Sequence, residues 1–186
     1  FYRQLHRALE GDQDRAAVPL AVLYLDLDGF KAINDDHGHA FGDEVLRTVA
    51  RRITQELPTE AFCGRLGGDE FAVALPGTTA VGATEVARAL LAAVSAPFDI
   101  DLPPDSSGAQ PGLVSVGVSV GIATSEAASH PDDLVDIADA ALLSAKRSGK
   151  GVWRVAGPAG GSAGGSAGGH GATDELAGPA GGEHPV

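Results

Sequence analysis

The stretch AFCGRLGGDEFAVALP, residues 61–76, decides the fold because it holds two apolar runs separated by a tight turn. Its Gly67-Gly68-Asp69 segment predicts a β-hairpin, since glycine adopts the positive φ angles that a type I′ turn needs. Glycine also lets a ligand approach the backbone closely. The adjacent acids Asp69 and Glu70 therefore mark either a solvated turn or the edge of a ligand site, and the hairpin alone does not decide between them.

A second apolar run, PLAVLYLDLD at residues 19–28, predicts a buried strand that carries two acids near its end. Because side chains alternate along a strand, Asp26 and Asp28 point to the same face. Carboxylates there are costly unless they are paired or bind a metal, although Asp28 alone is also explained as a strand-end cap. If the hairpin lies beside this strand, Asp26 and Asp69 converge and supply the hard oxygen ligands that Mg²⁺ or Mn²⁺ prefers. That pattern is typical of nucleotidyl transfer, in which metal ions hold phosphates and activate an attacking hydroxyl.

The rest of the chain alternates between helical and strand patterns. Helices are predicted over residues 1–10, 41–57, 79–95 and 130–149, further strands over 113–124 and 151–155, and a loop over 98–112. Glycines 117 and 121 in the 113–124 strand mark places of close backbone approach. This order predicts an α/β (α+β) domain with a central, mostly antiparallel sheet flanked by helices.

Composition narrows the classes of function. The chain has 186 residues and a net charge of −12, so it lacks the basic character of proteins that bind nucleic acid polymers. No apolar run is long enough to span a membrane and no signal peptide is visible, so we expect no membrane contact from this sequence. The single Cys63 excludes an internal disulfide. We expect residues 1–156 to form one N-terminally truncated domain, and the Gly-, Ala- and Ser-rich residues 157–186 to form a disordered tail.

Four blocks resemble the GGDEF-domain diguanylate cyclases: LDLDGFKAINDDHGHAFGDEVL (25–46), RLGGDEF (65–71), SVGIA (119–123) and ADAALLSAKRSGKG (138–151). The resemblance implies a ferredoxin-like palm, as in class III nucleotide cyclases, and the condensation of two GTP into cyclic di-GMP with release of two pyrophosphates. It implies that the 3′-hydroxyl of one GTP attacks the α-phosphate of the other across a homodimer. It further implies Mg²⁺ or Mn²⁺ as cofactor and a cytoplasmic module.

The resemblance also implies roles for individual residues. The implied metal ligands are Asp26, the Leu27 carbonyl, Asp69 and Glu70, of which Asp69 and Glu70 are also the implied catalytic residues. The implied substrate-binding residues are Asn34 and Asp43 at guanine, Gly67 and Gly68 beside GTP, Phe30 (through its N–H) and Lys31 at the phosphates, and Lys146 and Lys150 at the β- and γ-phosphates. Four of them also suit purely structural roles: the guanine-side pair as helix caps, and the two C-terminal lysines as cations that favour a helix C-terminus. We expect Arg65 to support the hairpin.

The chain departs from the family pattern at three places. Leu143 stands where the family usually has Tyr, and Lys150 stands where Arg is common, which keeps the charge but loses the bidentate fork. The segment Asp-x-Leu-Thr-x-Leu-x-Asn-Arg, which the family carries before the position of Phe1, is absent. The loss of that segment predicts either a weaker edge of the active site or a weaker dimer.

The product-binding Arg-x-x-Asp motif of many family members falls here on Pro58 and Ala61, neither of which forms a charge-assisted hydrogen bond. Arg51 and Arg52 precede these positions within reach of a phosphate but do not reproduce the motif, so we expect no feedback inhibition. The alternative to an active cyclase is a non-catalytic GTP-binding regulatory module of a larger cyclic di-GMP signalling protein. A purely structural interaction domain leaves the acids of both strands unexplained.

Overall fold

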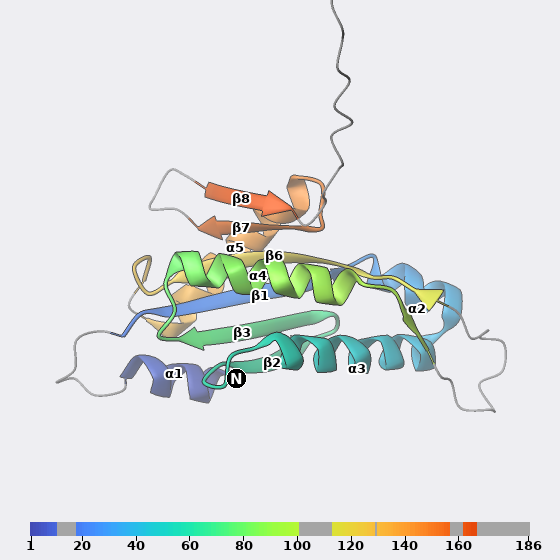
Figure 1. Ribbon diagram of the computed structural model, residues 1–186, viewed down its shortest axis with the longest axis horizontal. Helices are drawn as coiled ribbons and strands as arrows, with labels where there is room; N and C mark the ends of the chain where they lie inside the picture. The colour runs from blue at the N-terminus through green and yellow to red at the C-terminus, as the bar shows by residue number, and fades with distance from the viewer. Residues whose placement is uncertain (11–17, 101–112, 129, 157–161, 167–186) are drawn as a thin grey trace, which may run out of the picture.

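The computed structural model describes residues 1–10, 18–100, 113–128, 130–156 and 162–166. A six-stranded sheet forms the centre, and helices cover both of its faces (Figure 1). In chain order the elements are α1 (Tyr2–Glu10), β1 (Leu20–Asp28), α2 (Phe30–His37), α3 (His39–Glu56), β2 (Phe62–Gly67), β3 (Glu70–Pro76), α4 (Ala80–Ser95), β4 (Phe98–Asp99), β5 (Leu113–Val114), β6 (Gly117–Thr124), α5 (Pro131–Arg147), β7 (Val152–Ala156) and β8 (Ser162–Ser166). Within these ranges, no helix has both the length and the apolar character needed to cross a membrane.

The strand order β2-β3-β1-β6-β7-β8 places β1 among the inner strands of the sheet. All neighbouring pairs are antiparallel except β6 and β7, which are parallel. Strands β1, β2, β3 and β6 follow one another in a βαββαβ arrangement, and their spatial order is that of a ferredoxin-like fold. The predicted palm, with a mostly antiparallel central sheet flanked by helices, is confirmed.

Side chains of β1 alternate between two hydrophobic clusters. Leu23 and Leu25 lie in the larger cluster with α3 and α4, whereas Leu20 lies in a second cluster with α1 and α5. Figure 1 shows α4 in front of the sheet and α5 behind it. By the same alternation, Asp26 and Asp28 fall on the α5 face, at the opposite end of β1 from Leu20.

Gly121 of β6 allows α5 to approach the sheet closely. A Cβ built on Gly121 would lie 1.9 Å from the Ala138 carbonyl oxygen and 2.3 Å from the Leu142 backbone nitrogen. Both atoms belong to the α5 backbone, so a side chain here would displace the whole helix. The predicted close backbone approach is confirmed at Gly121, whereas at Gly117 the neighbour is the Asp28 side chain, 3.3 Å from such a Cβ.

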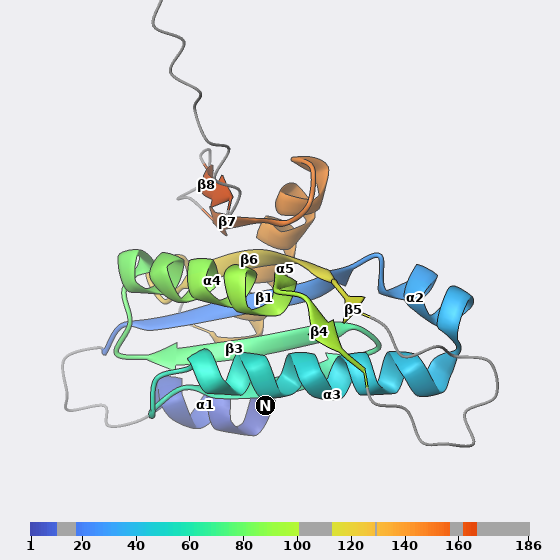
Figure 2. The ribbon, with the colours of Figure 1, turned by 45° about the vertical axis from the view of Figure 1, so that its right-hand side comes forward.

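Several element boundaries differ from the predictions. The helix predicted over 41–57 begins at His39, and the preceding α2 had no predicted bounds because its residues are few and mostly polar. The strand predicted over 113–124 is split, since β1 ends opposite Gly117 and offers no partner beyond it. Leu113–Val114 pairs instead with part of the predicted 98–112 loop, forming a short ribbon at the end of α4 (Figure 2). Residues 101–112 of that loop lie outside the described residues.

Strand β8 lies within the segment that was expected to be disordered, and the structure describes its five residues as a strand. It pairs antiparallel with β7 over the whole of β8. Such pairing needs only backbone groups, and it satisfies N–H and C=O groups that β7 would otherwise leave open at the edge of the sheet. The other residues of the predicted tail, 157–161 and 167–186, lie outside the described residues.

Candidate active site

The acids of β1 and of the β2–β3 turn lie together at one end of these neighbouring strands. Asp26 is the register partner of Glu70 in the β1–β3 pair, and the Leu27 N–H donates a hydrogen bond to the Asp69 carbonyl at 3.3 Å. The hairpin is therefore the neighbour of β1, which the predicted convergence of Asp26 and Asp69 requires. Asp26, Asp69 and Glu70 are all half-buried, so each remains accessible to a ligand at this end of the sheet.

The turn itself differs from the predicted type I′ geometry. Gly68 has a positive φ of 43°, but Gly67 and Asp69 do not have positive φ, and the β2–β3 register shifts between Arg65 and Gly67. A register shift of this kind bends the strand and re-aims the residues at its end. The Arg65 Nε–H donates to the Gly68 carbonyl at 2.8 Å, which confirms that Arg65 supports the hairpin.

Asp26 pairs with a lysine from α5. Lys146 Nζ lies 2.7 Å from Asp26 Oδ2, and 13% of the Asp26 side chain is exposed. Burial raises the pKa of Asp26 because desolvation disfavours the charged form, while Lys146 acts in the opposite direction. The Asp69 and Asp28 carboxylates also raise this pKa, so each of them lies close enough to repel the charged form of Asp26. The negative charge gathered at this end of the sheet therefore favours a bound cation.

The donor set fits a divalent cation that binds together with a phosphate ligand. Within the described ranges, no three His, Cys, Asp or Glu side chains are arranged to hold a metal ion by themselves. Mg²⁺, however, usually takes one or two carboxylates from the protein and completes its octahedron with waters and substrate phosphates. Asp26, Asp69 and the Leu27 carbonyl are oxygen donors of that kind.

Glu70 lies beside a tyrosine for which no role was predicted from the sequence. Burial, followed by the nearby Glu70 and Asp139 carboxylates, raises the pKa of Tyr24 to about 12. Tyr24 therefore keeps its proton at neutral pH and faces Glu70 as a neutral O–H group. Its position two residues before Asp26, on the same face of β1, was the available signal.

Asp28 has surroundings quite different from those of Asp26. Ser119 Oγ lies 3.0 and 2.9 Å from its two carboxylate oxygens, and the Gly151 N–H donates to Asp28 Oδ2 at 3.0 Å. Ser119 is completely buried. Asp28 therefore bonds to β6 and to the turn after α5, rather than capping its own strand. Ser119 belongs to the SVGIA block, and no role for its hydroxyl was predicted from the sequence.

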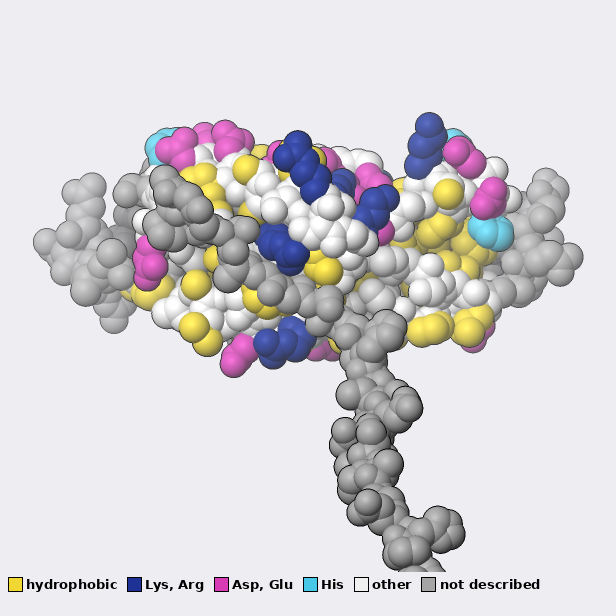
Figure 3. All heavy atoms as spheres, turned by 90° about the horizontal axis from the view of Figure 1, so that it is seen from above, with side chains coloured by type: hydrophobic (Ala, Val, Ile, Leu, Met, Phe, Trp, Pro, Cys, Tyr) yellow, Lys and Arg dark blue, Asp and Glu magenta, His cyan; other side chains and the backbone are white. Residues whose placement is uncertain are grey.

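The residues expected at the phosphates lie at the ends of two helices. Helix α2 begins directly after β1 with Gly29 as its N-cap, so Phe30 and Lys31 contribute the first N–H groups of that helix. Lys146 is in the last turn of α5, and Lys150 is in the turn that follows. Figure 3 shows Lys and Arg side chains near the middle of the face on the β7 side, so positive charge gathers locally in this acidic protein.

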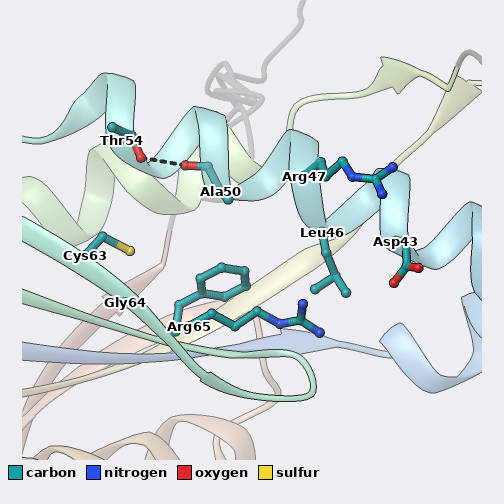
Figure 4. A pocket seen from close by; sticks show the side chains of 9 residues that line it. Asp43, Leu46, Arg47, Ala50, Thr54, Cys63, Gly64 and Arg65 are labelled. Carbon is teal, nitrogen blue, oxygen red and sulfur yellow. Dashed lines mark hydrogen bonds between the residues drawn. The ribbon is translucent and has the colours of Figure 1, made fainter. Parts of the chain in front are cut away.

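Of the two residues expected at guanine, Asn34 lies against Gly42 of α3 and Asp43 is the residue that follows Gly42. A Cβ on Gly42 would lie 1.9 Å from Asn34 Oδ1, so the amide of α2 lies directly against α3. Asp43, the next residue, lines a cavity of about 420 Å³ between α3 and the β2–β3 hairpin (Figure 4). The other lining residues are Leu46, Arg47, Ala50, Thr54, Cys63, Gly64, Arg65 and Phe71. Asn34 is not among them, so only one of the pair borders this cavity.

Neither guanine-side residue is a helix cap. The N-caps of α2 and α3 are Gly29 and Gly38, and neither forms a side-chain capping bond. Asn34 and Asp43 lie inside their helices, so the capping alternative does not explain them.

Cys63, on the cavity wall, is half-buried, and burial raises the pKa of its thiol to about 11. The thiol is therefore neutral and packs as a small apolar group.

The family described as "Diguanylate cyclase, GGDEF domain" matches residues 1–151. The chain belongs to this GGDEF family. Diguanylate cyclase TpbB of Pseudomonas aeruginosa is 40% identical over 158 residues, which make up 84% of this chain and 34% of TpbB. Cyclic di-GMP phosphodiesterase PdeR of Escherichia coli is 37% identical over 142 residues, or 75% of this chain and 20% of PdeR.

A crystal structure of the GGDEF domain of Pseudomonas aeruginosa YfiN, or TpbB, has the same fold. It matches with a TM-score of 0.74 and 41% identity over 84% of this chain and 93% of that chain. The present GGDEF domain thus spans about a third of the length of TpbB and a fifth of PdeR. Relatives with the same domain carry names for opposite reactions, so family membership alone does not fix the activity.

Of the two arginines considered for reach of a phosphate in this GGDEF domain, Arg51 and Arg52, the second has a structural role. Arg52 of α3 donates hydrogen bonds to the backbone carbonyls at the end of α4, those of Ala93, Val94, Ala96 and Pro97. Its guanidinium also lies 4.6 Å from the centre of the Phe98 ring. A cation at a helix C-terminus is favourable, so Arg52 ties α3 to α4 and is not free for a phosphate. Pro58 and Ala61, at the motif positions, remain uncharged neighbours of β2.

Proposed function

We propose that this GGDEF domain is a diguanylate cyclase, which condenses two GTP into cyclic di-GMP and releases two pyrophosphates. The observation that carries the proposal is that Asp26, Asp69 and Glu70 lie together at one end of the sheet. Lys146 of α5 lies 2.7 Å from Asp26. Carboxylates and lysines gathered in this way suit a metal-bound triphosphate. The name of the relative TpbB supports the same reaction.

The phosphates of GTP are bound from two sides. The Phe30 and Lys31 N–H groups at the start of α2 face an anion favourably, because a helix N-terminus carries unpaired donors and a positive dipole end. The Lys31 side chain adds a positive charge beside them. Lys146 and Lys150 bind the β- and γ-phosphates as point charges. When pyrophosphate is released, these contacts stabilise the negative charge of the leaving group.

The acids hold the cofactor and prepare the nucleophile. Asp26, the Leu27 carbonyl, Asp69 and Glu70 would hold Mg²⁺ or Mn²⁺, which supplies Lewis-acid stabilisation of the reacting phosphate. Asp69 and Glu70 are the catalytic residues, and Glu70 helps to accept the proton of the 3′-hydroxyl. The neutral Tyr24 O–H beside Glu70 orients that carboxylate. Burial raises the pKa of Asp26, so a cation bound beside it would stabilise its charged form.

Guanine is read at the junction of α2 and α3. Asp43 accepts hydrogen bonds from the N1–H and the 2-amino group, and Asn34 bonds N3 or the amino group. Gly67 and Gly68 border the nucleotide because they place no side chain in its way. The selectivity for GTP over ATP follows from these polar groups, which an adenine ring would leave unpaired.

Catalysis requires two chains. The described residues of one chain form one such site, and each GTP must present its hydroxyl to the α-phosphate of the other. A two-fold homodimer meets this requirement with one self-complementary surface. As part of the same proposal, the reaction takes place in the cytoplasm, where its substrate GTP is available.

The second candidate is a non-catalytic GTP-binding module that regulates a larger protein. PdeR, a relative named for cyclic di-GMP hydrolysis, and the departures at Leu143 and Lys150 favour it. The complete set of acids at positions 26, 69 and 70 favours the cyclase. The two candidates differ in turnover and not in GTP binding.

The test is turnover of GTP with Mg²⁺ by the parent chain and by Asp69→Asn. The variant removes a ligand charge and keeps the size of the side chain, so we expect turnover to fall about a hundredfold or more with an unchanged circular-dichroism spectrum. Asp136→Asn, an exposed change on α5, is the matched control and should keep the parent rate. GTP binding without turnover by the parent chain would select the regulatory module, and equal rates for Asp69→Asn and the parent would contradict the assignment of Asp69.

A further inference from the structure

The turn after α5 has an unusual backbone conformation. Gly149, Lys150 and Gly151 have successive φ angles of 111°, 63° and 60°. The Lys150 N–H donates to the Ala145 carbonyl and the Gly149 N–H to the Lys146 carbonyl, both at 3.4 Å, which is the hydrogen-bond pattern of a Schellman motif. The left-handed region is unfavourable for a residue with a side chain. Lys150 therefore holds a conformation that contacts outside the residue must maintain.

Those contacts come from Asp28 and Ser119. The Gly151 N–H lies 3.0 Å from Asp28 Oδ2 and 3.2 Å from Ser119 Oγ, and the Ser119 hydroxyl donates to the Asp28 carboxylate. The three groups form a closed set of hydrogen bonds that joins β1, β6 and the α5–β7 turn. Bonds between a carboxylate and a backbone N–H are charge-assisted and therefore strong.

The two acids of β1 hold the two ends of one turn. Asp26 pairs with Lys146, where the turn begins, and Asp28 bonds to Gly151, where it ends. Lys150 lies between these two anchors and is exposed, so its ammonium group is free to meet a ligand while its backbone is fixed. The arrangement separates the roles of two carboxylates that the DLD pattern makes look equivalent.

We propose that Asp28 is a positioning residue for triphosphate recognition. With Ser119 it fixes Gly151 and thereby places Lys150, together with Lys146, at the β- and γ-phosphates of GTP. The inference rests on the proposed function, and it gives Asp28 a task other than binding a second metal ion. It also gives a task to Ser119, whose hydroxyl is buried and directed at Asp28.

Calorimetric titration with two nucleotides tests this role. The ligands are 3′-deoxy-GTP, which binds without reacting because it lacks the attacking hydroxyl, and 3′-deoxy-GMP, which lacks the β- and γ-phosphates. Removing a hydrogen bond of this network by Ser119→Ala or Asp28→Ala should weaken binding of the triphosphate about tenfold. Binding of the monophosphate should stay within about twofold of the parent value, because only the outer phosphates meet the turn.

Two further variants separate positioning from metal binding and from a general loss of structure. Asp28→Asn keeps an oxygen that accepts the Gly151 N–H, so it should retain most of the triphosphate affinity that Asp28→Ala loses. Ser125→Ala removes a hydroxyl that accepts the Leu20 N–H at 3.1 Å, at the other end of β1 from Asp28, and should change neither affinity.

Two results would overturn the proposal. Equal weakening of both nucleotides by Ser119→Ala and Asp28→Ala would mean a general loss of structure. Loss of Mn²⁺ binding in Asp28→Asn, with an affinity as poor as that of Asp28→Ala, would make Asp28 a metal ligand. If the parent chain binds neither nucleotide, the proposed function itself fails, and the inference fails with it.

Discussion

Replacing Gly42 by alanine should damage nucleotide recognition while leaving the fold intact. The new Cβ would lie 1.9 Å from Asn34 Oδ1 and 3.2 Å from Phe30 Cζ. The first neighbour is the end of a polar side chain that can rotate away, so α2 and α3 need not separate. The Asn34 amide must therefore leave the position in which it is proposed to meet guanine.

The size of the effect follows from the geometry. Ordinary contact begins near 3.4 Å, so Asn34 Oδ1 must retreat by about 1.5 Å. A hydrogen bond does not survive such a shift, because N–H···O distances lie within roughly 2.7–3.2 Å. Losing it costs about 1–2 kcal/mol of binding, or about five- to thirtyfold in the dissociation constant. Alanine is favoured over glycine within a helix by about 0.5–1 kcal/mol, which offsets the tight contact with Phe30.

The assay is titration with 3′-deoxy-GTP, combined with thermal unfolding. Gly42→Ala should bind the nucleotide about five- to thirtyfold more weakly and melt within about 3 °C of the parent. Gly82→Ala is the matched control, because it is also a helix-interior change, on α4, and its Cβ would meet only Thr78 Cγ2 at 3.0 Å. A folded Gly42→Ala protein with the parental dissociation constant would refute the assignment of Asn34 to guanine.

Three further predictions concern the turn, the dimer and the product. Lys150→Gly should stabilise the fold by about 0.5–1 kcal/mol, because relief of the left-handed backbone exceeds the entropy cost of glycine, and it should weaken triphosphate binding; a lower melting temperature would argue against strain at Lys150. Turnover per chain should rise with protein concentration, because two chains must meet, and a constant specific activity from a sedimenting monomer would contradict the dimer. Cyclic di-GMP should inhibit only by competing with GTP, since Pro58 and Ala61 replace the charged motif and Arg52 is bound to α4; a tight product site that persists under saturating 3′-deoxy-GTP would show otherwise.

The hairpin and the strand before it could be predicted because their signals are local. Alternating side chains fixed the common face of Asp26 and Asp28, and the turn glycines marked the hairpin between β2 and β3. The turn geometry could not be predicted, since the register shift before Gly67 depends on how β2 meets β3. Gly121 could be interpreted correctly because a glycine inside a buried strand weakens the strand unless a neighbouring backbone needs the space.

The parts that could not be predicted depend on contacts between distant segments. The Asp28–Ser119–Gly151 network joins residues whose numbers differ by 91 and 123, so no local pattern reveals it. Arg52 looked available for a phosphate because the end of α4, 41 residues later, gives no sign of its position. Strand β8 was missed because its pairing uses backbone groups alone, and Gly- and Ser-rich sequence carries no strand signal.

Identification of the product formed from GTP tests the proposed reaction itself. The parent chain is incubated with GTP and Mg²⁺ at a concentration high enough for dimers to form. The products are then separated and identified by mass spectrometry. We predict cyclic di-GMP and pyrophosphate in a ratio of about one to two, since each of the two phosphodiester bonds releases one pyrophosphate. Unchanged GTP, or a cyclic mononucleotide as the only product, would contradict the assignment of this GGDEF domain as a diguanylate cyclase.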